Sequence, residues 1–221
     1  KRIAMTEEQQ TLWMSFIRED KTYTKYYDEF ATLLGTGMRV SEFCGLTKSD
    51  LDFENRRIRV DHQLVRERGG KYYVEKTKTE CGCRFIPMTE EVKELCQRIV
   101  ANRNKPKRES IIDGYGGFLF FDKEGKPMVA LHWEKYIQHA RDKYNRQHAL
   151  QLPPITPHIC RHTFCSNMAR QGMNPKTLQY IITRGITRCN SSVSGTSSAI
   201  DRVDSPPISI IVAPSFSIFS T

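Results

Sequence analysis

Near the middle of the chain, the spacing of hydrophobic residues changes from helical to strand-like. This change limits the possible folds more than any other feature of the sequence. Residues Arg57 to Val60 alternate between polar and apolar side chains, as a half-buried strand does. A second run, Lys71 to Thr79, follows Gly69-Gly70, a favourable hairpin turn. A third run, Cys83 to Pro87, returns along the sheet. The pattern predicts a three-stranded antiparallel sheet with tight turns.

The segments on either side of this sheet have apolar residues at helical spacing. Thr6 and Gln9 form a capping box before the first helix, and Thr47 caps a short turn after the third. Thr156-Pro157 and Asn174-Pro175 each place proline directly after an N-cap residue. We expect helices after Thr6 and over residues 23–34, 39–45, 90–99, 129–147, 157–170 and 175–182, with a loop and a buried strand over 114–121. The fold class is therefore α+β, mainly helical with one small sheet.

The sequence changes again after residue 182. Residues 183–221 contain ten serines and three basic residues, and no hydrophobic period is sustained there. This composition predicts a disordered or weakly structured tail. We therefore divide the chain into one domain over 1–182 and a divergent tail over 183–221. Because the chain begins at Lys1 rather than methionine, we also expect it to be part of a longer protein.

The charge of the chain favours a polyanionic partner. There are 34 lysines and arginines against 25 aspartates and glutamates, a net charge of +9, and such side chains displace counterions from phosphates. Seven irregularly spaced cysteines indicate reduced thiols and a cytoplasmic protein. We find no signal peptide, and the longest apolar stretch, Ile208 to Phe219, is too short to span a membrane.

Four basic residues form a candidate phosphate site. His158 and Arg161 are three residues apart at a helix start, so they share one face where backbone amides already favour anions. Arginine can donate two parallel hydrogen bonds to two phosphate oxygens. Arg39 follows a turn at the start of another helix, and Lys78 lies beside the hairpin turn. Taken alone, each of these residues is better explained as an ordinary exposed surface charge.

Together, their order and spacing resemble the tyrosine recombinases, the phage integrase family, and especially integrases of conjugative transposons. The likeness covers about residues 5–182 and is most specific over 33–51, 76–88 and 155–180. The motifs that carry it are Gly35 to Glu42, Thr77-Lys78-Thr79, Arg84 to Pro87 and Thr156 to Phe164. The resemblance implies the fold of DNA breaking–rejoining enzymes, here truncated at its C-terminus.

The resemblance also implies roles for these residues. Arg39 and Arg161 would hold the non-bridging oxygens of the scissile phosphate, and His158 would assist by hydrogen bonding or proton transfer. Lys78, on a mobile hairpin, would protonate the 5′-hydroxyl leaving group, with Lys76 as the alternative lysine. His162 would join Arg39, Lys78 and Arg161 in contacting DNA. No metal or other cofactor is expected.

The implied partner is double-stranded DNA, bound in the family by tetramers that exchange C-terminal segments between subunits. Family members also carry an N-terminal DNA-clamping domain, which would precede Lys1. We expect a cytoplasmic, nucleoid-associated protein of a bacterial cell, encoded by a mobile element and acting in DNA integration or excision.

The sequence departs from the family after Tyr180. A glycine-histidine-serine turn and then the nucleophilic tyrosine should follow, but residues 181–221 contain no histidine, tryptophan or tyrosine. Tyr180 itself occupies the position of a packing aromatic, and we expect a partly buried side chain there. A frameshift or rearrangement near codon 182 is our hypothesis for the tail. Without the nucleophile, the chain is expected to bind DNA without cleaving it.

Three other interpretations stay open at this point. Helices 157–170 and 175–182 have the outline of a helix-turn-helix transcription factor. Cys81 and Cys83, or His158 with Cys160, His162 and Cys165, could be part of a zinc site, although their spacing is unusual for one. The third is a non-catalytic fragment that pairs with intact recombinase subunits and interferes with them.

Overall fold

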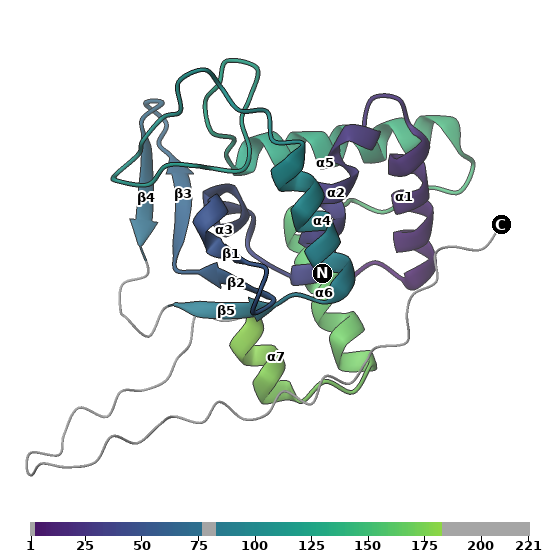
Figure 1. Ribbon diagram of the computed structural model, residues 1–221. Coiled ribbons are helices and arrows are strands. Elements are labelled where there is room, and N and C mark those ends of the chain that lie inside the picture. The colour runs from purple at the N-terminus through teal and green to yellow at the C-terminus, as the bar shows by residue number, and fades with distance from the viewer. Residues whose placement is uncertain (1–2, 77–82, 183–221) are drawn as a thin grey trace, which may run out of the picture. The chain divides into compact units, whose positions relative to one another are not determined.

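The computed structural model describes residues 3–76 and 83–182. Within these ranges the chain forms seven α-helices, two 3₁₀ turns and five strands, in an order that agrees with a mainly helical α+β domain (Figure 1). The helices are α1 (Glu7–Glu19), α2 (Tyr27–Thr36), α3 (Val40–Gly45), α4 (Glu90–Ala101), α5 (Ala130–Gln147), α6 (Pro157–Arg170) and α7 (Pro175–Ile182). The 3₁₀ turns are η1 (Thr24–Tyr26) and η2 (Lys48–Asp50).

The predicted caps form because they depend only on neighbouring residues. The Thr6 hydroxyl accepts from the Gln9 amide at 3.2 Å, and the Gln9 side chain accepts from the Thr6 amide at 3.0 Å. Thr156 accepts from the amide of Ile159, and Pro157 occupies the first helical position of α6. These contacts satisfy amides that would otherwise lack a partner at the helix ends.

The strands form two sheets rather than one. They are β1 (Leu51–Asp52), β2 (Arg57–Val60), β3 (His62–Arg66), β4 (Tyr72–Lys76) and β5 (Arg84–Pro87). One antiparallel sheet has the order β1-β2-β5, with Ile58 opposite Ile86. The other is the β3–β4 hairpin, with Leu64 opposite Val74. A three-stranded antiparallel sheet is therefore present, as predicted.

The membership of that sheet was predicted wrongly. We expected the run over 71–79 to pair with the strands at 57–60 and 83–87, but its described part pairs with β3. The chain continues from β2 through Asp61 directly into β3, so the Gly69-Gly70 turn closes a separate hairpin. Residues 118–121 are buried as expected, but their backbone pairs only through isolated bridges, Thr47 with Phe118 and Phe121 with Pro127.

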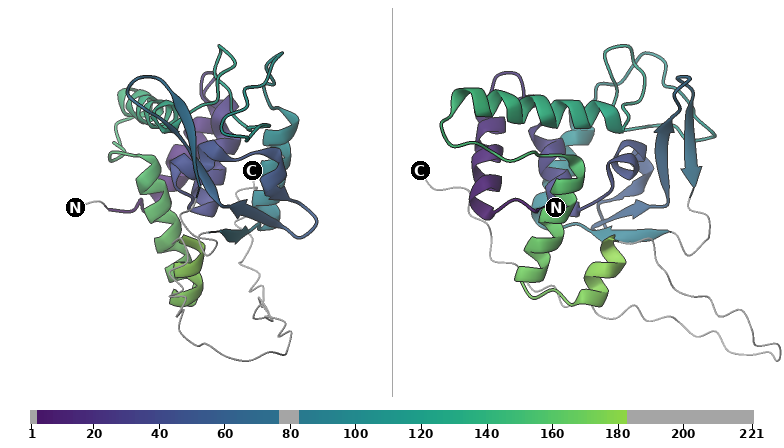
Figure 2. Two further views of the ribbon diagram at one scale, coloured as in Figure 1. Left: turned by 90° about the vertical axis from the view of Figure 1, so that its left-hand side faces the viewer. Right: turned by 180° about the vertical axis from the view of Figure 1, so that it is seen from behind.

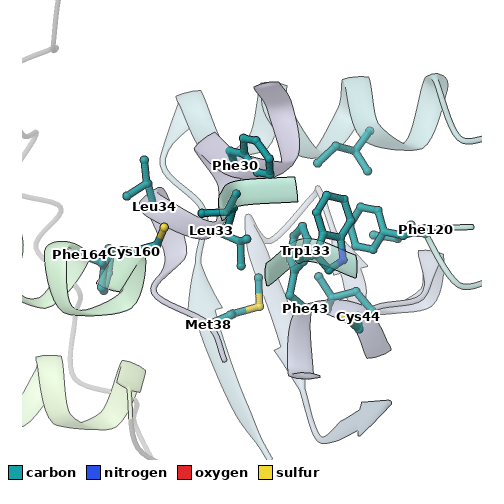
Figure 3. Packing of buried hydrophobic residues seen from close by; sticks show 14 of the residues in the cluster. Phe30, Leu33, Leu34, Met38, Phe43, Cys44, Phe120, Trp133, Cys160 and Phe164 are labelled. Carbon is teal, nitrogen blue, oxygen red and sulfur yellow. The ribbon is translucent and has the colours of Figure 1, made fainter. Parts of the chain in front are cut away.

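Large aromatic side chains pack together in the hydrophobic core of the described domain (Figure 3). Trp133 of α5 is fully buried and has its ring centroid 5.5 Å from that of Phe43 and 5.2 Å from that of Phe120. Phe30 of α2 stacks on Trp13 of α1, with their centroids 5.4 Å apart. Each fully buried side chain of this size contributes about 2 kcal/mol or more to stability.

Two features of the helices position the candidate site. α5 lies along one side of the unit and packs on α1, α3 and α6, while α7 packs on both α6 and β5 (Figure 2). Near β5 the start of α3 and the end of α7 meet, because Arg84 of β5 donates to Glu42 of α3 and to the carbonyl of Ile181. Arg161 of α6 donates to the carbonyl of Ile182 at the same place. None of the described helices has both the length and the apolar character needed to cross a membrane.

Candidate phosphate-binding site

Arg39 is placed by a turn that only glycine can make. α2 ends at Thr36. Its C-cap residue, Gly37, has a left-handed φ of 61°, and a Cβ there would lie 2.4 Å from Cδ1 of Phe164. The chain then turns outward at Arg39, which has extended backbone and is the N-cap residue of α3. The Arg39 side chain remains 41% exposed, so it can reach a ligand.

A buried carboxylate holds this arginine in place. Glu42 accepts hydrogen bonds from the backbone amide of Arg39 at 3.0 Å and from its Nη1 at 2.9 Å. The same carboxylate accepts from both terminal nitrogens of Arg84, at 3.0 and 2.7 Å. Burial alone raises the pKa of Glu42, but the hydrogen bonds and charges of Arg84 and Arg39 hold that pKa below its ordinary value. Glu42 is therefore ionised and fixes the orientation of Arg39.

Arg161, one turn after His158 on α6, is largely buried. Its Nη1 donates to the carbonyl of Gly37 at 2.5 Å, and its Nη2 donates to the carbonyl of Ile182. Burial, and then repulsion from Arg39, lowers the pKa of Arg161 to about 10. The guanidinium thus stays charged at neutral pH, and two backbone carbonyls from distant segments fix its position.

Two histidines lie beside Arg161. The Nε2 atoms of His158 and His162 are 2.9 Å apart, and the rings are nearly perpendicular. At this distance one nitrogen donates and the other accepts, so the tautomer of each ring depends on the other. His158 is the more exposed of the two.

A groove of about 650 Å³ brings three of the predicted residues together. Arg39, His158 and Arg161 all line it, with the polar face of α5 and the residues before α6 on its other sides. His162 and Tyr180 do not line it. Two guanidinium groups and an imidazole at the start of a helix form a site for a phosphate-like anion.

The lysine of the predicted set is not placed. Lys78 lies outside the described residues. Lys76, the alternative, ends β4 with an exposed side chain, and its Nζ lies 5.6 Å from the ring centroid of Tyr115. The structure therefore does not decide between these two lysines.

Comparisons with known proteins identify the family of the chain. A model of the phage integrase family matches residues 4–183. The chain belongs to the phage integrase family. Over 178 residues it is 49% identical to the transposase from transposon Tn916 of Enterococcus faecalis, covering 80% of this chain and 44% of the relative. Over 153 residues it is 27% identical to tyrosine recombinase XerA of Thermococcus onnurineus, covering 69% and 44% of the two chains.

Solved integrase structures have the same fold. The Tn1549 transposon integrase in complex with circular intermediate DNA has a TM-score of 0.79 and 49% identity, covering 82% of this chain and 59% of that one. The catalytic core of lambda integrase has a TM-score of 0.54 at 15% identity, which supports the fold alone. The chain spans less than half the length of the curated relatives it matches.

Two buried residues that hold the candidate site, Glu42 and Arg84, were not predicted from the sequence. Glu42 was missed although it occupies the capping-box position three residues after Arg39. Arg84 is fully buried and pairs with Glu42 across 42 positions of sequence, for which no local signal exists. Tyr180 was expected to be a partly buried helix residue, and it lies on α7 with half of its surface exposed.

The possible metal sites fit poorly in this integrase-family chain. Cys160 is fully buried, and burial raises the pKa of its thiol to about 12, so the thiolate that zinc requires is disfavoured. Among the described residues, Asp50, Asp61 and His62 are close enough to share an ion. However, Oδ2 of Asp50 already accepts from the amide and hydroxyl of Thr47. His62 is likewise bonded to Asp61 and to the carbonyl of Gly45. This group is a structural network.

Proposed function

We propose that this chain is the phosphate-binding part of a site-specific DNA recombinase, and that it binds double-stranded DNA without cleaving it. One observation carries the proposal: Arg39, His158 and Arg161 line one groove although Arg39 lies far from the other two in the sequence. The similar Tn1549 transposon integrase was solved in complex with circular intermediate DNA, which supports the same ligand.

In the proposed reaction the two arginines hold the non-bridging oxygens of the scissile phosphate. Their fixed positive charges would stabilise the additional negative charge of the pentavalent transition state. His158 would donate or transfer a proton at that phosphate, and Lys78 would protonate the 5′-hydroxyl leaving group. In the complete reaction a tyrosine would attack the phosphorus and displace that hydroxyl, leaving a 3′-phosphotyrosine bond.

The nucleophile is the part that this chain lacks. Residues 181–221 contain no tyrosine, and Tyr180 is outside the groove. The family match ends at residue 183, which supports our division of the chain at residue 182. We further propose that the intact protein acts as a tetramer on DNA inside the bacterial cell, and that this chain can interfere with intact subunits.

The helix-turn-helix alternative is less well supported. In that alternative, α6 and α7 would form an independent motif that contacts the bases of DNA. Instead, Arg161 of α6 is directed inward to the carbonyls of Gly37 and Ile182, and the carbonyl of Ile181 on α7 accepts from Arg84 at 2.9 Å. These contacts join both helices to the rest of the domain and to the phosphate-binding groove.

The DNA-binding half of the proposal is tested by fluorescence anisotropy with a labelled duplex. Arg39→Ala should weaken binding by about tenfold, because a charge-assisted hydrogen bond to phosphate is lost. The matched control is Arg98→Ala, which removes an equally exposed arginine of α4 outside the groove and should leave the affinity nearly unchanged. Equal effects of the two substitutions, or no binding by the parent chain, would contradict the proposal.

The cleavage half is tested with a nicked suicide substrate that traps the covalent intermediate. We expect no protein–DNA adduct on a denaturing gel from this chain, whereas the Tn916 transposase serves as the positive control. An adduct that disappears in Tyr180→Phe would identify Tyr180 as an unexpected nucleophile and overturn this half of the proposal.

A further inference from the structure

One face of α5 lines the phosphate-binding groove opposite the predicted residues. Glu134, Gln138 and Arg141 are four and three residues apart, so they lie on the same side of the helix. All three line the groove that contains Arg39, His158 and Arg161. The resemblance to the recombinases assigned no role to any of them.

Arg141 has unused hydrogen-bonding capacity in this groove. Its Nη2 lies 3.1 Å from the Oδ1 of Asp142, and the side chain is 21% exposed. Its Nε is buried and has no hydrogen-bond partner among the described residues. A buried donor of a charged group that is left unpaired costs free energy. Because Arg141 lines the groove and its side chain is partly exposed, an anion bound there would offer an acceptor to this guanidinium.

The shape and charge of the groove indicate what this anion is. From Glu134 to Arg141 the helix face is about 10 Å long, at about 1.5 Å per residue. Along one DNA strand this length corresponds to about three nucleotides, at about 3.4 Å each. A single phosphate between Arg39 and Arg161 would leave this face unoccupied, whereas a DNA strand along the groove would place further phosphates beside it.

We infer that Arg141 binds a second backbone phosphate of the DNA, distinct from the scissile phosphate held by Arg39 and Arg161. The inference rests on the proposed function, because it needs DNA in the groove. Arg141 is a binding residue and takes no part in the bond changes. The carboxylate of Glu134, two turns earlier, repels phosphate and so restricts the phosphate contact on this face to its Arg141 end.

The first experiment compares Arg141→Ala with Lys135→Ala, using the full chain and duplexes of two unrelated sequences. Lys135 is an exposed residue of the same helix that does not line the groove, so it controls for the loss of one charge from α5. Arg141→Ala should weaken binding to both duplexes by about tenfold and reduce the salt slope by about one. A loss confined to one sequence would indicate a base contact and overturn the inference.

The second experiment locates the contact with single methylphosphonate substitutions, each of which removes one phosphate charge. The parent chain should lose affinity at one position where Arg141→Ala shows no further loss. Arg39→Ala should lose its sensitivity at a different position. A change in folding alone cannot produce this pairing of one side chain with one phosphate. If Arg141→Ala is affected at every position as the parent chain is, Arg141 does not contact the backbone.

These measurements distinguish failure of the proposed function from failure of the role inferred for Arg141. If the parent chain binds neither duplex, the proposed function itself is wrong. If the parent chain binds and Arg39→Ala is weakened, but Arg141→Ala resembles Lys135→Ala, only the role of Arg141 is wrong. Thermal unfolding of each variant by circular dichroism identifies any substitution that acts through loss of the fold.

Discussion

At the scale of single residues, several positions in this domain have more than one structural role. Gly37 is the C-cap residue of α2, permits close contact with Phe164 of α6, and offers its carbonyl to Arg161. Glu42 caps α3 and accepts from two arginines that come from different elements. Substitutions at such positions should therefore affect stability and the groove together.

Gly37→Ala should destabilise the domain by about 2 to 4 kcal/mol. Alanine is strained at a left-handed φ, and its Cβ would overlap the ring of Phe164. Urea unfolding measures this loss. Gly69→Ala is the control, because a Cβ there has no neighbour within 4 Å, and its effect should stay within about 0.5 kcal/mol. Equal stability of the two variants would show that the contact with Phe164 is unimportant.

Glu29 should make the domain less stable as the pH rises. Burial raises the pKa of this carboxyl to about 7, and its Oε2 has no hydrogen-bond partner among the described residues. A raised carboxyl pKa stabilises the folded state below the ordinary value of 4.5, and this contribution is lost as the pH rises through 7. Glu29→Gln removes the titration, so the stability of the variant relative to the parent should increase by about 3 kcal/mol between pH 4 and pH 8.

Denaturant unfolding at a series of pH values checks this expectation. Glu19→Gln makes the same chemical change at an exposed position of α1 and serves as the control. If the stabilities of the two variants change with pH by the same amount, the carboxyl of Glu29 is not held in an unfavourable environment.

At the scale of secondary-structure elements, the sequence predicts contacts between neighbouring residues. It does not predict which strands or side chains pair across long stretches of sequence. The Thr6 and Thr156 caps were predictable because each contact spans three residues. The sheet membership was not, because the alternating runs do not specify which strand each will meet, and β3 was overlooked between two better signals. Likewise the shared helix face of His158 and Arg161 follows from their three-residue spacing, whereas Arg84 joins Glu42 and the end of α7 through contacts without a local pattern.

Arg84→Lys tests whether this arginine fixes the end of α7. Lysine keeps the charge but cannot reproduce the two parallel bonds to Glu42 and the bond to the carbonyl of Ile181. We expect a loss of about 2 to 4 kcal/mol and faster hydrogen exchange in residues 176–182. Arg98→Lys, in an exposed ion pair with Asp28, should cost less than about 1 kcal/mol. Unchanged exchange in α7 would contradict the role of Arg84.

At the scale of the whole molecule, the groove exists only because distant parts of the chain meet. The bond from Arg161 to Gly37 spans 124 positions, and the bond from Arg84 to Ile181 spans 97. The last described residues, Ile181 and Ile182, are themselves bound by these two arginines. The junction at which family likeness ends is therefore held by Arg84 and Arg161, and under the proposed function a nucleophile segment continuing from it would begin beside Arg161.

A chimaera tests this view of the whole chain. Residues after Ile182 are replaced by the corresponding C-terminal segment of the Tn916 transposase, where the family pattern predicts the glycine-histidine-serine turn and the tyrosine. If residues 1–182 already hold the phosphate correctly, the chimaera should form a covalent adduct with a suicide duplex that carries the recombination site of that transposase. The same chimaera with Arg161→Ala should bind the duplex but form far less adduct, since one transition-state donor is worth roughly a hundredfold or more in rate. A chimaera that binds DNA normally yet forms no adduct would show that the phosphate-holding groove, and not only the nucleophile, is defective in this chain.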